Sequence, residues 1–272
     1  MKSWTRLGGV IAAVTVVAVV ATVGASAKPQ ADNPYNLATA GTLVVGMDLE
    51  FKPEMYLQNG KPAGYDVELL NAVAKILGVK VKIENLSFNG LIPGLVSKKF
   101  DIVSVGLSPT PERKKAISFS RAYVPYAQVL AAKKGDSTGA SMSAWNSPDK
   151  TITSLQGSTA EQLVKSDFPK AKSSSFPDQN SAFLQVATGR ADGIVVENYL
   201  LAQFNKSNGN KLAEVPFPKP LQVQYGSYGV QKGNNALVKA LNGAICKLQS
   251  NGQLAKIYQR TEGTKLPPMP AC

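Results

Sequence analysis

Two short segments combine residue types that can bind a small anion. The first, GLSPTPERKK, follows an apolar run and brings Ser108, Thr110 and Arg113 close together in the chain. Thr110 can cap a helix, and Pro111 suits its first position, where no backbone N–H is needed. Acidic residues are preferred in a first helical turn, so Arg113 there calls for a compensating anion, and a planar guanidinium can hold a carboxylate by two hydrogen bonds. The alternative is an ordinary capped helix with solvated basic residues.

The second segment, LQGSTAEQLVK, follows the strand-like TITS. Ser158 and Glu161 have the S-x-x-E spacing of a capping box, which accounts for both residues structurally. Thr159 has no part in that motif. We expect its hydroxyl to reach the same ligand from the opposite side, although plain capping explains the segment as well.

The composition excludes several classes of enzyme. Histidine is absent from the chain. A histidine-ligated metal site, a Ser-His-Asp hydrolase and a Cys-His protease are therefore excluded. The chain also has no G-x-x-x-x-G-K-[ST] loop and no G-x-G-x-x-G after a strand, so nucleotide-binding folds gain no support. We expect no metal and no cofactor.

The charge is strongly basic but dispersed. The 272 residues include 30 Lys and Arg against 18 Asp and Glu, a formal net charge of +12. Only five of the basic residues are Arg, and the Lys residues do not form a stripe interleaved with aromatic residues. This pattern indicates a solvated basic surface and no nucleic-acid partner.

The N-terminal segment has the layout of a secretory signal peptide. Lys2 and Arg6 precede an uncharged apolar stretch that ends in Ala25-Ser26-Ala27. Small residues at that point fit a cleavage site, so we predict a signal peptide over residues 1–27, cleaved after Ala27, and a periplasmic protein. Because the apolar stretch is long, a retained membrane anchor is the alternative.

Cys246 and Cys272 are the only cysteines. In an exported protein an even number of cysteines favours a disulfide, which here would tie the Pro-rich C-terminal tail to the helix around Cys246. Two free thiols are the alternative.

Strands and helices alternate along the rest of the chain. An apolar strand is predicted at 42–47, and helical spacing begins at Asp66 and stops at Gly78. Further strands are expected at 79–86, 100–106, 123–134, 151–156, 193–196, 212–217 and 221–233, with helices between and after them. A Gly/Ser-rich break at 135–150 separates two such series. The pattern predicts an α/β protein with parallel packing and two lobes, with a ligand-binding cleft between them.

The chain resembles the periplasmic amino-acid-binding proteins that serve ABC importers. The resemblance is carried by GTLVVGMDLEF, GYDVELLNAVAKILG, the run 91–120, LQGSTAEQLV and GRADGIVVEN. It implies the type II periplasmic-binding-protein fold, two α/β lobes joined by two hinge strands. Lobe 1 would comprise 28–126 and 225–272, and lobe 2 would comprise 127–224. The implied function is capture of an L-amino acid and its delivery to an ABC transporter permease, by a protein that we expect to be a monomer and not an enzyme.

The same resemblance assigns ligand-binding roles to particular residues. Arg113 is similar to the residue that clamps the ligand α-carboxylate, and the Gly106 carbonyl is similar to an acceptor for the α-ammonium. Phe51 and Phe88 match aromatic walls, for which core packing is the alternative, and Asp48 matches a residue that meets the ligand side chain. The full predicted set is Asp48, Phe51, Phe88, Gly106, Ser108, Arg113, Leu155, Ser158, Thr159 and Glu197.

Two residues depart from the family pattern. Glu197 stands where the family usually has Asp for the ammonium, and Glu54 stands where an aromatic residue is common; we expect Glu54 to be solvated at the cleft rim. Leu155 brings no charge while Asp48 brings an anion, which favours a polar or cationic ligand side chain. Glu197 opposite Arg113 also keeps open a periplasmic enzyme similar to cyclohexadienyl or arogenate dehydratase, with Glu197 as general acid.

Overall fold

The computed structural model describes residue 1 and residues 33–272, so all of the predicted signal peptide except Met1 lies outside the described residues. The helices in the described part are α1 (Tyr65–Leu77), α2 (Phe88–Val96), α3 (Pro111–Ala116), α4 (Met142–Trp145), α5 (Thr159–Asp167), α6 (Gln179–Ala187), α7 (Asn198–Ser207), α8 (Asn235–Ser250) and α9 (Gln253–Glu262).

The strands form one large sheet and one small one. The large sheet contains β1 (Thr42–Met47), β5 (Lys80–Asn85), β6 (Ile102–Leu107), β7 (Ile117–Lys133), β8 (Thr151–Leu155), β9 (Lys172–Phe176), β10 (Gly193–Glu197), β11 (Leu212–Glu214) and β12 (Gln222–Gln231). The small sheet contains β2 (Glu50–Phe51), β3 (Met55–Gln58) and β4 (Lys61–Ala63).

The large sheet is mixed, with the predicted parallel pairs toward both ends and antiparallel pairs in the middle. Its order is β5-β1-β6-β12-β7-β10-β8-β9, with β11 paired to β7. The outer pairs are parallel, whereas β12 runs antiparallel to both β6 and β7, and β7 runs antiparallel to β10. The two long strands β7 and β12 are not joined to their neighbours in the sheet by βαβ crossovers. They can therefore run antiparallel to those neighbours.

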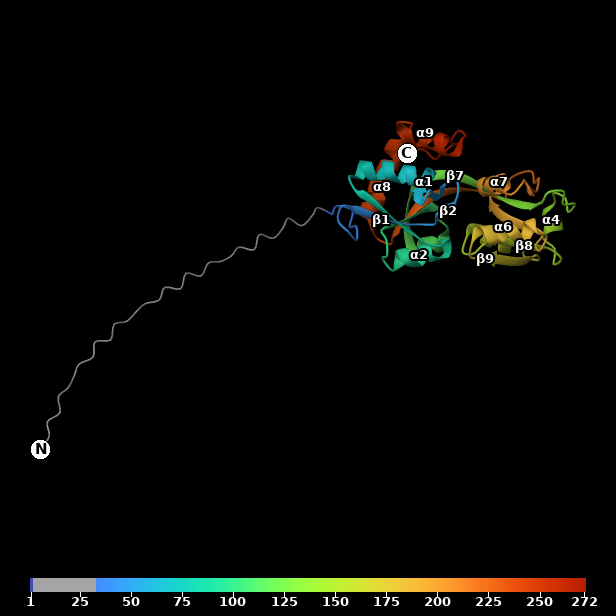
Figure 1. Ribbon diagram of the computed structural model, residues 1–272, viewed down its shortest axis with the longest axis horizontal. Coiled ribbons are helices and arrows are strands. Elements are labelled where there is room, and N and C mark those ends of the chain that lie inside the picture. The colour runs from blue at the N-terminus through green and yellow to red at the C-terminus, as the bar shows by residue number, and fades with distance from the viewer. Residues whose placement is uncertain (2–32) are drawn as a thin grey trace. The chain divides into compact units, whose positions relative to one another are not determined.

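These two central strands connect two groups of elements. In Figure 1 the first lobe holds α1, α2, α8 and β1, and the second lobe holds α4, α6, α7, β8 and β9, with β7 running between them. The N-terminal part of β7 pairs with β12, which also pairs with β6. The C-terminal part of β7 pairs with β10. The strands β7 and β12 are therefore the hinge strands of two α/β lobes.

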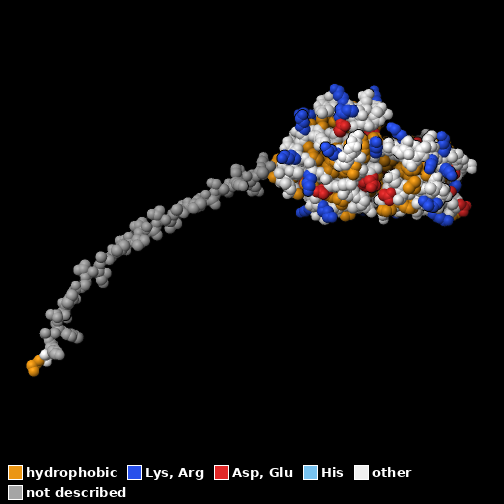
Figure 2. Space-filling model, in the orientation of Figure 1, with side chains coloured by type: hydrophobic (Ala, Val, Ile, Leu, Met, Phe, Trp, Pro, Cys, Tyr) orange, Lys and Arg blue, Asp and Glu red, His pale blue; other side chains and the backbone are white. Residues whose placement is uncertain are grey.

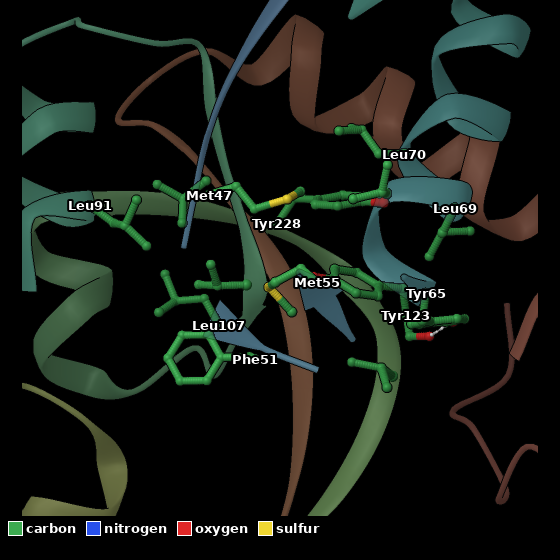
Figure 3. Packing of buried hydrophobic residues seen from close by; sticks show 14 of the residues in the cluster. Met47, Phe51, Met55, Tyr65, Leu69, Leu70, Leu91, Leu107, Tyr123 and Tyr228 are labelled. Atoms are coloured by element: carbon green, nitrogen blue, oxygen red, sulfur yellow. Dashed lines mark hydrogen bonds between the residues drawn. The ribbon is translucent and has the colours of Figure 1, made fainter. Parts of the chain in front are cut away.

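The first lobe has a core of close-packed apolar and tyrosine side chains. Figure 3 shows Phe51 and Leu107 on one side of the cluster, Tyr65 and Tyr123 on the other, and Met55 between them. The Tyr65 hydroxyl donates to the backbone carbonyl of Tyr123 at 2.7 Å, which satisfies a buried polar group. A smaller cluster around Trp145 and Phe168 forms a separate apolar core in the second lobe.

Local signals fixed several element ends as predicted. The helix α1 ends at Gly78 with φ 71°, a left-handed conformation that glycine adopts without strain. Thr110 caps α3, because its Oγ1 accepts from the Arg113 backbone N–H at 3.3 Å. The strand β9, the single-turn helix α4 and the small sheet were not predicted. Their sequences are short or polar and lack a clear hydrophobic period.

The predicted disulfide between Cys246 and Cys272 is confirmed. Arg121 supports it, because its guanidinium donates to Cys246 Sγ and to the backbone carbonyls of Pro270 and Ala271. The C-terminal tail is therefore tied to α8 and to β7.

Basic side chains are spread over the visible face in Figure 2 and are not gathered into one stripe. Within residues 33–272 no helix has both the length and the apolar composition needed to span a membrane.

Candidate functional site

A cavity lies between the two lobes beside the hinge strands. In the present arrangement it is narrow, about 30 Å³, which is room for roughly one water molecule. Its lining is Phe51, Phe88, Val105, Gly106, Leu107, Ser108, Arg113, Tyr126, Leu155, Ser158, Thr159, Glu197, Tyr199 and Leu200. Nine of the ten predicted ligand-binding residues are in this lining, all except Asp48. Segments more than 140 residues apart in the chain are thus brought to one cavity.

Arg113 joins the two lobes directly. It is 7% exposed, and its Nη1 donates to the Ser108 carbonyl at 3.1 Å in the first lobe. Its Nη2 donates to the Gly157 carbonyl at 3.1 Å, in the turn before α5 of the second lobe. Burial lowers the pKa of Arg113 from its usual value, and the negative charge of Glu197 opposes that change. Arg113 and Glu197 are therefore opposite charges that share one poorly solvated site.

The hydroxyls of Ser108 and Thr159 meet at a side chain that the sequence did not indicate. Gln224 of β12 accepts at Oε1 from Ser108 Oγ at 3.0 Å and from Thr159 Oγ1 at 2.9 Å. All three side chains are buried. Ser108 Oγ also lies within hydrogen-bond distance of the Tyr126 hydroxyl.

The Gly106 carbonyl is engaged by Tyr126. The Tyr126 hydroxyl donates to it at 2.8 Å and shares that one proton with Ser108 Oγ, whose own proton goes to Gln224. Gly106 has φ 58°, and a Cβ at Gly226 of β12 would lie 2.6 Å from the Gly106 Cα. Both glycines are needed there, one for a left-handed turn of the backbone and one for the close approach of two strands. The role of Gly106 as an ammonium acceptor stays a prediction.

Glu197 is held by the other hinge strand. Gln128 of β7 donates through Nε2 to Glu197 Oε1 at 2.8 Å and to Thr159 Oγ1 at 3.1 Å. Burial raises the pKa of Glu197, while the Gln128 hydrogen bond and the Arg113 charge lower it. A cationic group in the cavity would favour the charged form of this carboxyl.

Phe51 and Phe88 form one wall. Their ring centroids are 6.2 Å apart with an angle of 83° between the planes, an edge-to-face contact. Phe51 is also packed in the main hydrophobic cluster, as the core-packing alternative expects, and its role as a wall for the ligand stays a prediction. The Arg113 guanidinium carbon lies 5.7 Å from the Phe88 ring centroid, which places a cation against the aromatic wall.

Asp48 lies outside the lining of the cavity. It is 5% exposed, and burial together with the charges of Glu50 and Asp178 raises its pKa to about 7. Asp178 caps α6 in the second lobe, whereas Glu50 is in β2 of the first. Acidic groups from both lobes therefore act on Asp48, and a nearby cation would reduce their repulsion.

The second predicted segment caps its helix in a modified way. Ser158 Oγ accepts from the Glu161 backbone N–H at 3.2 Å and donates to the Leu155 carbonyl at 2.7 Å. Glu161 does not bond back to Ser158, as a capping box would require; its Oε2 accepts from the Gly157 N–H at 2.7 Å. That bond holds the turn whose carbonyl receives Arg113.

The expected position of Glu54 was wrong. It is 4% exposed and not solvated at a rim, because the turn before β3 directs it into the first lobe near Asp66 and Glu262. Burial raises the pKa of Glu54 well above its usual value, and the two neighbouring carboxyls raise it further. Within residues 33–272 no group of three Cys, Asp or Glu side chains has an arrangement that could hold a metal ion.

Sequence reasoning missed Tyr126, Gln128, Tyr199 and Gln224. A faint indication was present, since Gln128 directly precedes the apolar run VLAA, and both faces of the strand are buried there. Polar residues in such strands are usually hydrogen-bonded, but a sequence does not name the partner.

Residues 43–263 match the model of the bacterial extracellular solute-binding proteins, family 3. The arginine-binding extracellular protein ArtP of Bacillus subtilis is 28% identical over 220 residues, covering 80% of this chain and 85% of that protein. The L-cystine-binding protein TcyJ of Escherichia coli is 27% identical over 251 residues, covering 91% and 93%.

Solved structures give the same result. An ancestral arginine-binding protein bound to arginine has a TM-score of 0.74 and 34% identity, covering 81% of this chain and 97% of that one. An ancestral amino-acid-binding protein, described as a precursor of cyclohexadienyl dehydratase, has a TM-score of 0.73 and 34% identity, covering 81% and 94%. The two lobes and two hinge strands are thus the type II periplasmic-binding-protein fold, and the chain belongs to the bacterial extracellular solute-binding proteins, family 3.

Proposed function

We propose that this protein captures an L-amino acid with a cationic or polar side chain between its lobes and delivers it to an ABC transporter permease. The observation that carries the proposal is the pair Arg113 and Glu197, opposite charges in one buried cavity. A zwitterion satisfies both at once, with its carboxylate at Arg113 and its ammonium at Glu197. The rings of Phe51 and Phe88 supply an apolar wall for the carbon atoms between them.

The acidic groups around Asp48 favour a cationic side chain. Glu50 of the first lobe and Asp178 of the second add to the effect of burial, which is the main cause of the raised pKa of Asp48. A guanidinium or ammonium group nearby would stabilise the charged form of Asp48. Arginine-binding proteins among the relatives support the same choice.

Closure follows from this arrangement. A ligand that contacts Arg113 in the first lobe and Glu197 in the second stabilises only the arrangement in which both are near. The closed protein would then present one surface to the permease. We expect the export signal to be cleaved after Ala27 and the mature protein to act in the periplasm as a monomer.

A thermal-shift screen of the twenty amino acids and L-cystine tests the proposal, because binding to the native state alone raises the unfolding midpoint. We expect the largest shift with L-arginine or another cationic amino acid, followed by isothermal titration calorimetry on that compound. If no amino acid raises the midpoint and none gives a binding isotherm, the proposed function is wrong.

A second candidate is a dehydratase with Glu197 as general acid. Burial raises the pKa of Glu197, which a general acid near neutral pH requires, and one structural relative is a precursor of such an enzyme. The test is turnover of prephenate or L-arogenate. Product formation by the wild type that is lost in Glu197→Gln would favour the enzyme, and no turnover with amino-acid binding intact would favour the receptor.

A further inference from the structure

The two hydroxyls expected to bind a ligand carboxylate are already committed to the protein itself. Ser108 lies in the first lobe, after β6, and Thr159 begins α5 in the second lobe. Each donates its hydroxyl proton to Oε1 of Gln224, at 3.0 Å and 2.9 Å. One amide oxygen on a hinge strand thus accepts two hydrogen bonds, one from each lobe.

The position of Gln224 directs those protons away from the ligand. Ser108 and Thr159 line the cavity, whereas Gln224 does not; with Thr159 and Gln222 it lines a separate groove beside Thr110. A serine or threonine hydroxyl has a single proton to donate. While that proton goes to Gln224, the hydroxyl oxygen can only accept on the cavity side, and a carboxylate cannot donate to it.

The second hinge-strand glutamine is arranged differently. Gln128 is fully buried and also contacts Thr159, but it donates to Thr159 Oγ1 and to Glu197 Oε1. Both of these partners belong to the second lobe, Thr159 at the start of α5 and Glu197 at the end of β10. Gln128 therefore accepts no hydrogen bond from the hydroxyl of Ser108 or Thr159. It does not link the two lobes through these hydroxyls.

We propose that Gln224 is a positioning residue that substitutes for the ligand carboxylate: by accepting from Ser108 and Thr159 together, it holds the two lobes closed and competes with an incoming anion for the two hydroxyl protons. The affinity part of this inference rests on the proposed function, whereas the closure part does not. Its consequence is that Gln224 weakens ligand affinity while it favours closure of the unliganded protein.

Three forms of the full protein test the proposal: wild type, Gln224→Leu and Gln224→Glu. Leu keeps the bulk but removes the acceptor, so both protons can turn to the cavity, and Kd for L-arginine should fall by about three- to tenfold, the worth of one net hydrogen bond. Glu places an anionic acceptor there, so at pH 8 Kd should rise by a similar or larger factor. A side chain that acts only by packing would not shift affinity in opposite directions.

The size of the protein without amino acid is measured in parallel by small-angle X-ray scattering. We expect Gln224→Leu to have a larger radius of gyration than wild type, because a bridge between the lobes has been removed. The matched control is Gln128→Leu, which changes the same residue type at a buried place on the other hinge strand. It should weaken L-arginine binding, because Thr159 and Glu197 lose their donor, and it should leave the radius of gyration at the wild-type value.

Thermal unfolding of each variant identifies any that fails to fold. If one of Gln224→Leu and Gln224→Glu does not fold, the other still tests the proposal. The proposal is overturned if Gln224→Leu binds L-arginine as wild type does or less tightly, or if its unliganded dimensions equal those of wild type. If the wild type itself does not bind L-arginine, the ligand assignment fails, and the scattering comparison still decides whether Gln224 holds the lobes closed.

Discussion

The guanidinium of Arg113 crosses from one lobe to the other and donates from Nη2 to the carbonyl of Gly157 at 3.1 Å. The same side chain donates from Nη1 to Ser108 in its own lobe. Both bonds are made to the protein itself, one in each lobe. Arg113 therefore combines two tasks, since it carries the positive charge of the cavity and links the lobes that must close around a ligand.

Arg113→Ala should abolish tight amino-acid binding. The ligand carboxylate would be buried without a charged partner, which costs about 3 kcal/mol or roughly a hundredfold in Kd. Arg113→Lys keeps the charge but loses the planar fork, so its affinity should lie between those of wild type and Arg113→Ala. Isothermal titration calorimetry with L-arginine measures both variants. Wild-type affinity in Arg113→Ala would show that the carboxylate is bound elsewhere.

Glu197→Gln should weaken binding through the ammonium group. The variant keeps the size of the side chain but removes the charge opposite Arg113, and we expect a loss of about 2 kcal/mol for L-arginine. An analogue of arginine without the α-amino group serves as the control, because it should bind wild type and variant with similar affinity. Equal losses for both compounds would contradict contact between Glu197 and the ammonium.

The buried carboxyls of the first lobe should make the protein more stable in mild acid. Burial raises the pKa of Asp66 to about 6, and burial with the Asp66 charge raises that of Glu262 to about 7. Between about pH 4 and 7 the folded protein holds protons that the unfolded chain releases, so the free energy of unfolding falls as pH rises through this range. For Asp66 the change is of the order of 3 kcal/mol. Urea unfolding at pH 5 and pH 7.5 measures it.

Glu54→Gln tests the origin of that pH dependence. Glu54 Oε2 and Asp66 Oδ1 are buried without a hydrogen-bond partner, and Gln at position 54 no longer has to keep a proton that the unfolded chain releases as pH rises. We expect a gain in stability at pH 7.5 that is larger than at pH 5. Exposed Glu214→Gln is the matched control and should change neither value. An equal loss of stability at both pH values in Glu54→Gln would mean that this carboxyl is structurally required.

The disulfide should contribute to global stability. It joins residues separated by 26 positions, and closing a loop of that size restricts the unfolded chain by about 3 kcal/mol. A variant with Cys246→Ser and Cys272→Ser should lose that amount in urea unfolding, and wild type in reducing agent should behave in the same way. No difference between oxidised and reduced wild type would indicate that the bonds from Arg121 alone hold the tail.

The sequence alone determined what depends on neighbours along the chain. One helical turn or one short run of residues encodes the cap at Thr110, the helix end at Gly78 and the strand at 42–47. Residue types alone therefore predict where these elements begin or end. The family resemblance added the cavity residues, and the structure brings all of them except Asp48 to one lining.

Only the tertiary structure decided which polar atoms meet across the hinge. Ser108 and Gln224 are 116 residues apart, and their contact depends on the register of β12 against β6 and β7, which no local pattern encodes. The burial of Glu54 was decided in the same way, because a carboxyl in a short polar turn looks solvated until the Asp66 and Glu262 that surround it are placed. Hydrogen-bond partners and burial are properties of packing between distant segments, whereas caps and strands are properties of the chain itself.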